Sequence, residues 1–225
     1  YNGNVYILDF DPNNTVRRID AVTKKISTIS PVIDNYALGS TNTSSCIDIS
    51  RDATGKEYLY VVWMNYSSYA GRIYRYELKA TAPYAEARTL FAGNGNATYS
   101  GDGIPAIYAG VGAEVLMGLA IDTAGNVYFS SYDPSLDTTI APSHSLIRKV
   151  DAATGIINTI LKKDIADGNS LLNFAHNAKM ACDAAGNLYF APYSNATEPY
   201  IQRYDAATNA LQPDITRREL TVAAG

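Results

Sequence analysis

The sequence is poor in the residues on which metal binding and catalysis most often depend. It contains two histidines and two cysteines in 225 residues, and its net charge is −4. The acidic balance argues against a nucleic-acid-binding surface, which would need clustered lysine and arginine. No apolar run approaches the roughly 20 residues that a membrane-spanning helix requires. We therefore expect no nucleic-acid partner and no membrane span in this segment, and we predict no cofactor.

Helix-favouring Glu, Lys and Gln are also sparse, whereas strand-favouring residues are abundant. The chain holds 18 tyrosines, and Val, Ile and Thr are plentiful. Gly and Pro recur between short apolar runs, as expected where tight turns join many strands. The composition therefore predicts an all-β fold.

Five Asn-x-Ser/Thr triplets, none with proline in the middle, are candidate N-glycosylation sites. They begin at Asn13, Asn42, Asn65, Asn96 and Asn195. A glycosylated asparagine must be exposed, and its protein must have passed through a secretory pathway. We therefore expect the protein to be extracellular or at the cell surface.

One phrase, a glycine followed by a polar residue and an apolar, aromatic run, occurs four times. It reads GNVYIL from Gly3, GKEYLYVV from Gly55, GNVYFSS from Gly125 and GNLYFAPY from Gly186. In three copies an aspartate stands three positions before the glycine, at Asp52, Asp122 and Asp183. Such repetition is typical of architectures in which similar units stack on one another.

A second phrase follows each glycine phrase and ends on an acid, with a basic residue two positions earlier. The pairs are Arg18 and Asp20, Arg75 and Glu77, Lys149 and Asp151, and Arg203 and Asp205. A short turn and another apolar strand come next. Each unit therefore predicts a four-stranded antiparallel meander whose hairpins are closed by turns of the D-x-x-G and D-A-A-T-G kind.

A single meander of this size cannot bury both of its faces, so the units must stack, and radial stacking gives a β-propeller. We expect one propeller region over residues 1–225, with about four blades at approximately 1–38, 39–95, 96–165 and 166–225. The first blade lacks its opening strand, and no strand remains to close a ring. We therefore expect the segment to belong to a larger propeller or to one that another chain completes.

The third repeat carries the most specific pattern. It reads FAGNGNATYSGDGIPAIYAGVGAEVLMGLAIDTAGNVYFSSYDPS from Phe91 and closes with SLIRKVDAATGIINTI at Ile160. This stretch resembles the NHL-repeat family, and the resemblance extends in order over the whole chain. The second repeat departs from the pattern, because Gly55-Lys56 replaces Gly-Asn. The resemblance implies a propeller, usually with six blades.

Few side chains suggest a ligand site. His144 and His176 fall in a loop and a linker that share the usual ligand face of such a propeller. The loop tyrosines Tyr99, Tyr108 and Tyr132 offer an aromatic contact surface. Some propellers resembling this one, the amidating lyases, hold zinc with histidines. Two histidines without HxH or HxxxH spacing do not supply the ligands that zinc needs. We therefore predict no metal site and no catalytic residue.

The remaining conspicuous residues are expected to be structural. Cys46 and Cys182 fall in opening strands two blades apart, farther than a disulfide spans. Two buried free thiols are expected, and a disulfide to another segment is the alternative. Asp102, in a Gly-Asp-Gly sequence, is expected to cap backbone amides in a linker turn.

These observations predict a non-catalytic extracellular propeller that serves as a protein-binding, glycan-binding or scaffolding module, with self-assembly as one such role. One alternative is a propeller hydrolase or lyase that uses the channel mouth near His144 and His176. Another is a cell-surface receptor ectodomain.

Overall fold

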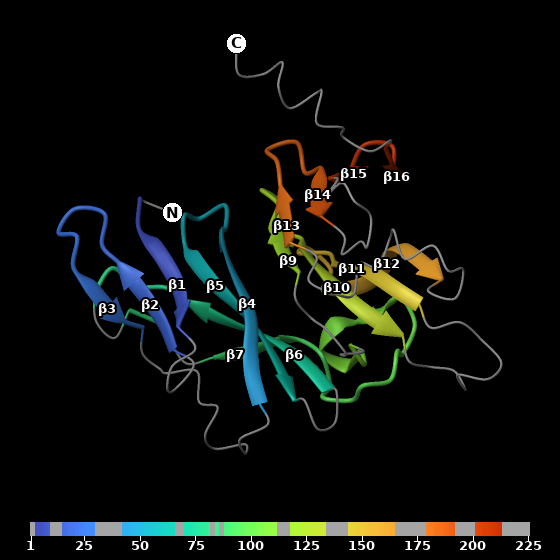
Figure 1. Ribbon diagram of the computed structural model, residues 1–225, viewed down its shortest axis with the longest axis horizontal. Coiled ribbons are helices and arrows are strands. Elements are labelled where there is room, and N and C mark those ends of the chain that lie inside the picture. Colours follow the sequence, from blue (N-terminus) through green and yellow to red (C-terminus); the bar gives the residue numbers. More distant parts are fainter. Residues whose placement is uncertain are drawn as a thin grey trace, which may run out of the picture.

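The chain folds into four antiparallel β-sheets that follow one another in chain order (Figure 1). The computed structural model describes residues 3–9, 15–29, 42–65, 70–81, 84–85, 88–111, 118–133, 144–164, 179–191 and 201–212. The one helix among them is a short 3-10 turn, η2 (Ala106–Tyr108). The prediction of an all-β, antiparallel fold is therefore confirmed.

Strands that follow one another in the chain pair side by side in every sheet, except that β8 of sheet 3 pairs with β12. Sheet 1 contains β1 (Val5–Asp9), β2 (Thr15–Ile19) and β3 (Ile26–Thr28). Sheet 2 contains β4 (Asn42–Arg51), β5 (Glu57–Asn65), β6 (Ala70–Glu77) and β7 (Thr89–Ala92). Sheet 3 contains β8 (Ile104–Pro105), β9 (Leu119–Ile121), β10 (Val127–Asp133), β11 (His144–Val150) and β12 (Ile156–Asp164). Sheet 4 contains β13 (Lys179–Cys182), β14 (Leu188–Ala191), β15 (Gln202–Asp205) and β16 (Ala210–Leu211).

Sheet 3 differs from the expected four strands because it has a fifth, β8. The chain turns at Gly101 and Gly103, both with positive φ, and β8 then pairs with the outer strand β12. Asp102 holds this turn in place: its Oδ1 accepts a hydrogen bond from the backbone N–H of Thr159 at 2.8 Å and lies 3.1 Å from Nη2 of Arg148. The Gly-Asp-Gly sequence therefore fastens the incoming chain to the outer edge of sheet 3.

The D-x-x-G turns have the same hydrogen bonds wherever the sequence repeats. In sheet 3, Oδ1 of Asp122 accepts the backbone N–H groups of Ala124 and Asn126, and its Oδ2 accepts the hydroxyl of Tyr128. Asp52 and Asp183 accept the corresponding bonds in sheets 2 and 4. In sheets 2, 3 and 4, these carboxylates therefore stabilise the turn of the hairpin that joins the first two strands of the repeat.

The two faces of each sheet are named by the order of the sheets in the chain. The upstream face is the side on which the preceding sheet packs in the interior of the row, and the downstream face is the side on which the following sheet packs; the end sheets are named in the same sense. The downstream face of sheet 2 packs Tyr60 and Val62 against Val127 and Phe129 on the upstream face of sheet 3. A similar core joins sheets 1 and 2, and another joins sheets 3 and 4. Apolar residues therefore fill three successive layers between four sheets, and their burial is the main force holding the sheets together.

The opening strands of sheets 2, 3 and 4 lie next to one another, with β9 between β4 and β13. One polar bond crosses between them: the backbone N–H of Ile121 donates to Oδ2 of Asp48 at 3.0 Å. Burial raises the pKa of Asp48 to about 6, against the lowering effect of the amides of Ile49 and Ile121. Asp48 therefore links two sheets in a poorly solvated place.

Candidate functional site

The ligand-face candidates that the structure describes come from different elements of the chain. The sequence placed His144 and Tyr132 in a loop, which is wrong: His144 begins β11 and Tyr132 lies in β10. The hairpin is longer than expected because its pairing continues outward through Tyr132 with Ser145 and Asp133 with His144. His176 lies outside the described residues.

The two remaining tyrosine candidates have different surroundings. Tyr99 is half-buried, its hydroxyl lies 3.3 Å from Oγ1 of Thr159, and the guanidinium of Arg148 stacks 4.7 Å from its ring centre. Tyr99 therefore helps to fix the linker to sheet 3. Tyr108, in η2, is exposed, and it is the one of these tyrosines that remains available as a contact residue.

The candidate glycosylation sites are distributed over several elements. Asn96 is exposed. Asn42 and Asn65 are paired across β4 and β5 at the end of sheet 2. Asn13 and Asn195 lie outside the described residues.

Both cysteines are free thiols, as the sequence predicted, but they are half-buried rather than fully buried. Burial, together with the nearby carboxylates of Asp122 and Asp48, raises the pKa of Cys182 to about 12. The thiol is therefore protonated at neutral pH and a weak nucleophile.

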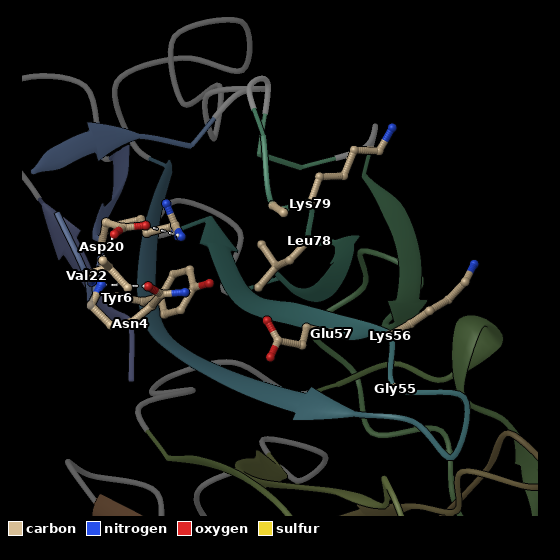
Figure 2. A pocket seen from close by; sticks show the side chains of 12 residues that line it. Asn4, Tyr6, Asp20, Val22, Gly55, Lys56, Glu57, Leu78 and Lys79 are labelled. Atoms are coloured by element: carbon tan, nitrogen blue, oxygen red, sulfur yellow. Dashed lines mark hydrogen bonds and ion pairs between the residues drawn. The ribbon is translucent and has the colours of Figure 1, made fainter. Parts of the chain in front are cut away.

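A first cleft of about 350 Å³ lies between sheets 1 and 2 (Figure 2). Asn4, Tyr6 and Asp20 of sheet 1 face Glu57 across it, while the ammonium group of Lys56 points away. Its acids already have partners. Asp20 lies 2.8 Å from Arg18 and caps the next turn, and Glu57 lies 2.6 Å from Arg51. Both acids of this cleft are therefore already paired with an arginine.

A second, larger cleft of about 480 Å³ lies between sheets 2 and 3. Its lining is Ser50, Arg51, Asp52, Ala53, Tyr58, Tyr60, Arg75, Phe91, Thr123, Ala124, Gly125, Ala152 and Ala153. The Arg75 guanidinium lies over two rings, 4.8 Å from the centre of Tyr58 and 5.8 Å from that of Phe91. Tyr60 meets Phe91 edge-on at 5.0 Å. One wall is therefore aromatic and cationic, and the other consists of small residues.

The upstream face of sheet 1 is an exposed apolar surface. Val5 and Ile7 are 53% and 40% exposed, whereas Val127 and Phe129, at the same repeat positions in sheet 3, are both 0% exposed. Ile26 is 53% exposed, and its counterpart Ile157 is buried. Among the described residues, no sheet packs on this face, which lies at one end of the row of sheets (Figure 1).

The downstream face of sheet 4 lies at the other end of the row (Figure 1). Ala181 and Ala191 are exposed on it, and Tyr189 and Arg203 are half-buried. In the other sheets, the tyrosine and the basic residue at these repeat positions line the boundary with the next sheet. The two end faces therefore correspond to the two sides of an interior sheet boundary.

No helix among the described residues has the length and the hydrophobicity that a membrane span requires. The described residues also contain no group of three or more His, Cys, Asp or Glu side chains placed to hold a metal ion.

Comparison with known proteins gives a distant likeness. No family model matches the chain, and no curated protein matches it. Among solved structures it is similar to a luciferin-regenerating enzyme, at 14% sequence identity and a TM-score of 0.44. The alignment covers 94% of this chain and 61% of that structure, so the chain spans less than two thirds of its length.

Proposed function

We propose that this chain is a propeller-type binding and scaffolding module that acts outside the cell and assembles through the faces of its sheets. The observation that carries the proposal is the exposed upstream face of sheet 1, where Val5, Ile7 and Ile26 stand at positions that are buried between interior sheets. A contiguous apolar surface of this kind marks an interaction site.

The partner we propose is a second copy of the chain, bound through the downstream face of its sheet 4. That face carries Tyr189 and Arg203 at the repeat positions that, in interior sheets, adjoin the apolar upstream face of the next sheet. The two faces differ, so copies associate head to tail, and such contacts build closed rings or open filaments.

The repeated carboxylates support a structural rather than a chemical use of the repeat. Asp20, Asp151 and Asp205 each accept backbone N–H groups in the turn after the third strand. Like the D-x-x-G aspartates, they stabilise hairpin turns by accepting hydrogen bonds from turn amides. Exposed Asn96 supports an extracellular location, because its Asn-x-Thr triplet is accessible to glycosylation.

The test is sedimentation velocity over a range of protein concentrations. The wild type is expected to associate, and Val5→Asp with Ile7→Asp is expected to remain monomeric, because charges would be buried in the contact. Val22→Asp is the matched control, since Val22 is 87% exposed at a turn tip and lies off the face. A wild type that stays monomeric at every concentration would overturn the proposed self-assembly.

A mixing experiment tests the head-to-tail arrangement. Ala181→Asp damages the sheet 4 face and Val5→Asp the sheet 1 face, so each variant alone should be monomeric. An equimolar mixture keeps one intact pair of faces and should give a dimer and nothing larger. No dimer in the mixture would contradict the pairing of these two faces.

A further inference from the structure

Arg75 differs from the basic residues at the same position of the other repeats. Arg18 lies 2.8 Å from Asp20, and Arg203 lies 3.4 Å from Asp205. The pKa of Asp151 is lowered mainly by hydrogen bonds from Thr154 and also by the charge of Lys149. Among the described residues, the guanidinium of Arg75 has no carboxylate and no hydrogen-bond partner, and only aromatic rings contact it.

Two departures of sheet 2 from the repeat explain this difference. The turn asparagine found in sheets 1, 3 and 4 is replaced by Lys56, and the closing aspartate is replaced by Glu77. The ammonium of Lys56 lies 3.0 Å from the carboxylate of Glu77 and forms an ion pair with it. In the other repeats, the acid at this position lies near the basic residue instead. The same pair of changes therefore leaves Arg75 a cation without a counter-charge.

The position of Arg75 suits an incoming anion. Stacking on Tyr58 and Phe91 fixes the plane of the guanidinium and leaves the N–H groups at its rim able to donate. Arginine in this state binds a carboxylate through two parallel hydrogen bonds. The second cleft, into which Arg75 faces, has a volume of about 480 Å³, within the range of small-molecule sites.

The rest of the cleft favours a flat, ring-shaped ligand. The wall formed by the turns of sheet 3 consists of Thr123, Ala124, Gly125, Ala152 and Ala153, none of which has a long side chain. The facing wall is aromatic, and Ser50 and Thr123 bring hydroxyl groups. A sugar ring combines an apolar face with hydroxyls at its rim and matches both kinds of surface.

We propose that this cleft binds an acidic sugar residue, with its carboxylate on the guanidinium of Arg75. The carboxylate of Asp52 also lines the cleft, but it accepts the amides of Thr54 and Lys56 and the Tyr58 hydroxyl. Arg51 also lines the cleft but is paired with Glu57 at 2.6 Å, so Arg75 is the cation of the lining that an incoming anion would meet. This site is separate from the sheet faces of the proposed assembly and does not depend on them.

The experiment titrates the full chain with glucuronate and, in parallel, with glucose, and follows binding by ligand-observed NMR. A ligand of this size should bind in the millimolar range. Glucuronate is expected to bind at least tenfold more tightly than glucose, and added salt should weaken its binding. Equal affinity for the two sugars would overturn the proposal, as would an absence of binding.

Variants assign the binding to Arg75. Arg75→Gln should lose at least tenfold in affinity for glucuronate. Lys56→Asn with Glu77→Asp should have a similar effect with the arginine still present, because it restores an acid partner as in sheets 1 and 4. Lys149→Gln, at the same repeat position in sheet 3 and outside both the cleft and the two end faces, is the matched control and should bind as the wild type does. Thermal unfolding verifies that each variant is folded. Unchanged binding by Arg75→Gln would overturn the assignment.

Discussion

Sheets 1 and 3 are built on nearly the same phrase, yet they bury it very differently. GNVYIL in sheet 1 and GNVYFSS in sheet 3 make the same turn contact: the asparagine Oδ1 accepts the N–H of Ala21 in one and of Ala152 in the other, both at 2.9 Å. Val5 and Ile7 are nevertheless exposed, whereas Val127 and Phe129 are buried. The repeat therefore determines its own hairpin, but burial depends on whether a neighbouring sheet is present.

The largest expected effect tests this difference in burial directly. Phe129→Ala should lower the free energy of unfolding by about 3–5 kcal/mol, because it leaves a cavity between sheets 2 and 3. Ile7→Ala, at the same repeat position in sheet 1, should cost less than about 1 kcal/mol in the monomer. Urea denaturation at low protein concentration measures both. Equal losses would mean that sheet 1 is covered in solution.

The second effect concerns Asp48, which lies where sheets 2 and 3 meet and has a pKa raised to about 6 by burial. Because the carboxyl is more easily deprotonated in the unfolded chain, its contribution to stability is fully present below about pH 4. It is lost as the pH rises through about 6. The two-unit rise corresponds to roughly 2–3 kcal/mol.

Asp48→Asn removes this titration. The free energy of unfolding of the variant, measured from pH 4 to pH 7, should rise relative to the wild type as the pH increases. Asp20 is the contrasting group, because its half-buried carboxylate accepts turn amides that lower its pKa to about 2. Asp20→Asn should therefore lose stability relative to the wild type as the pH rises from about 2 to 4. Parallel pH curves for wild type and Asp48→Asn would contradict the raised pKa.

The smallest effect separates the two turn asparagines. Asn126 accepts the N–H of Ala152 and also donates to Oδ2 of Asp122 at 2.8 Å. Asn126→Ala should cost about 1–2 kcal/mol, since two bonds are lost and a buried carboxylate loses a donor. Asn4 accepts the N–H of Ala21 and hydrogen-bonds to Tyr6, neither of which is a buried carboxylate, so Asn4→Ala should cost less, about 0.5–1 kcal/mol. Thermal unfolding would measure the difference, and a larger loss at Asn4 would contradict this ranking.

The sequence was sufficient to predict the strands and turns, because both depend on local chemistry. Asp122, Gly125 and Asn126 specify a hairpin wherever they recur. It did not predict β8, because pairing between Ile104 and Ile157 joins segments over fifty residues apart. It also did not predict that Arg75 lacks a counter-charge. Lys56 and Glu77 are visible in the sequence, but their pairing depends on the register of β5 against β6. The outer end of the β10–β11 hairpin was missed because Asp133, Ser145 and His144, which take part in its last pairs, are not typical strand residues.

The short strand β8 also affects how sheets of this kind can join. An outer strand with free amides and carbonyls invites another strand to add to it, and proteins avoid aggregation by blocking such edges. Here the edge of β12 is partly covered by a strand of two residues, one of which, Pro105, has no amide hydrogen to donate. Lateral growth by strand addition is therefore disfavoured at sheet 3, so the proposed association of copies would use the apolar sheet faces rather than the strand edges.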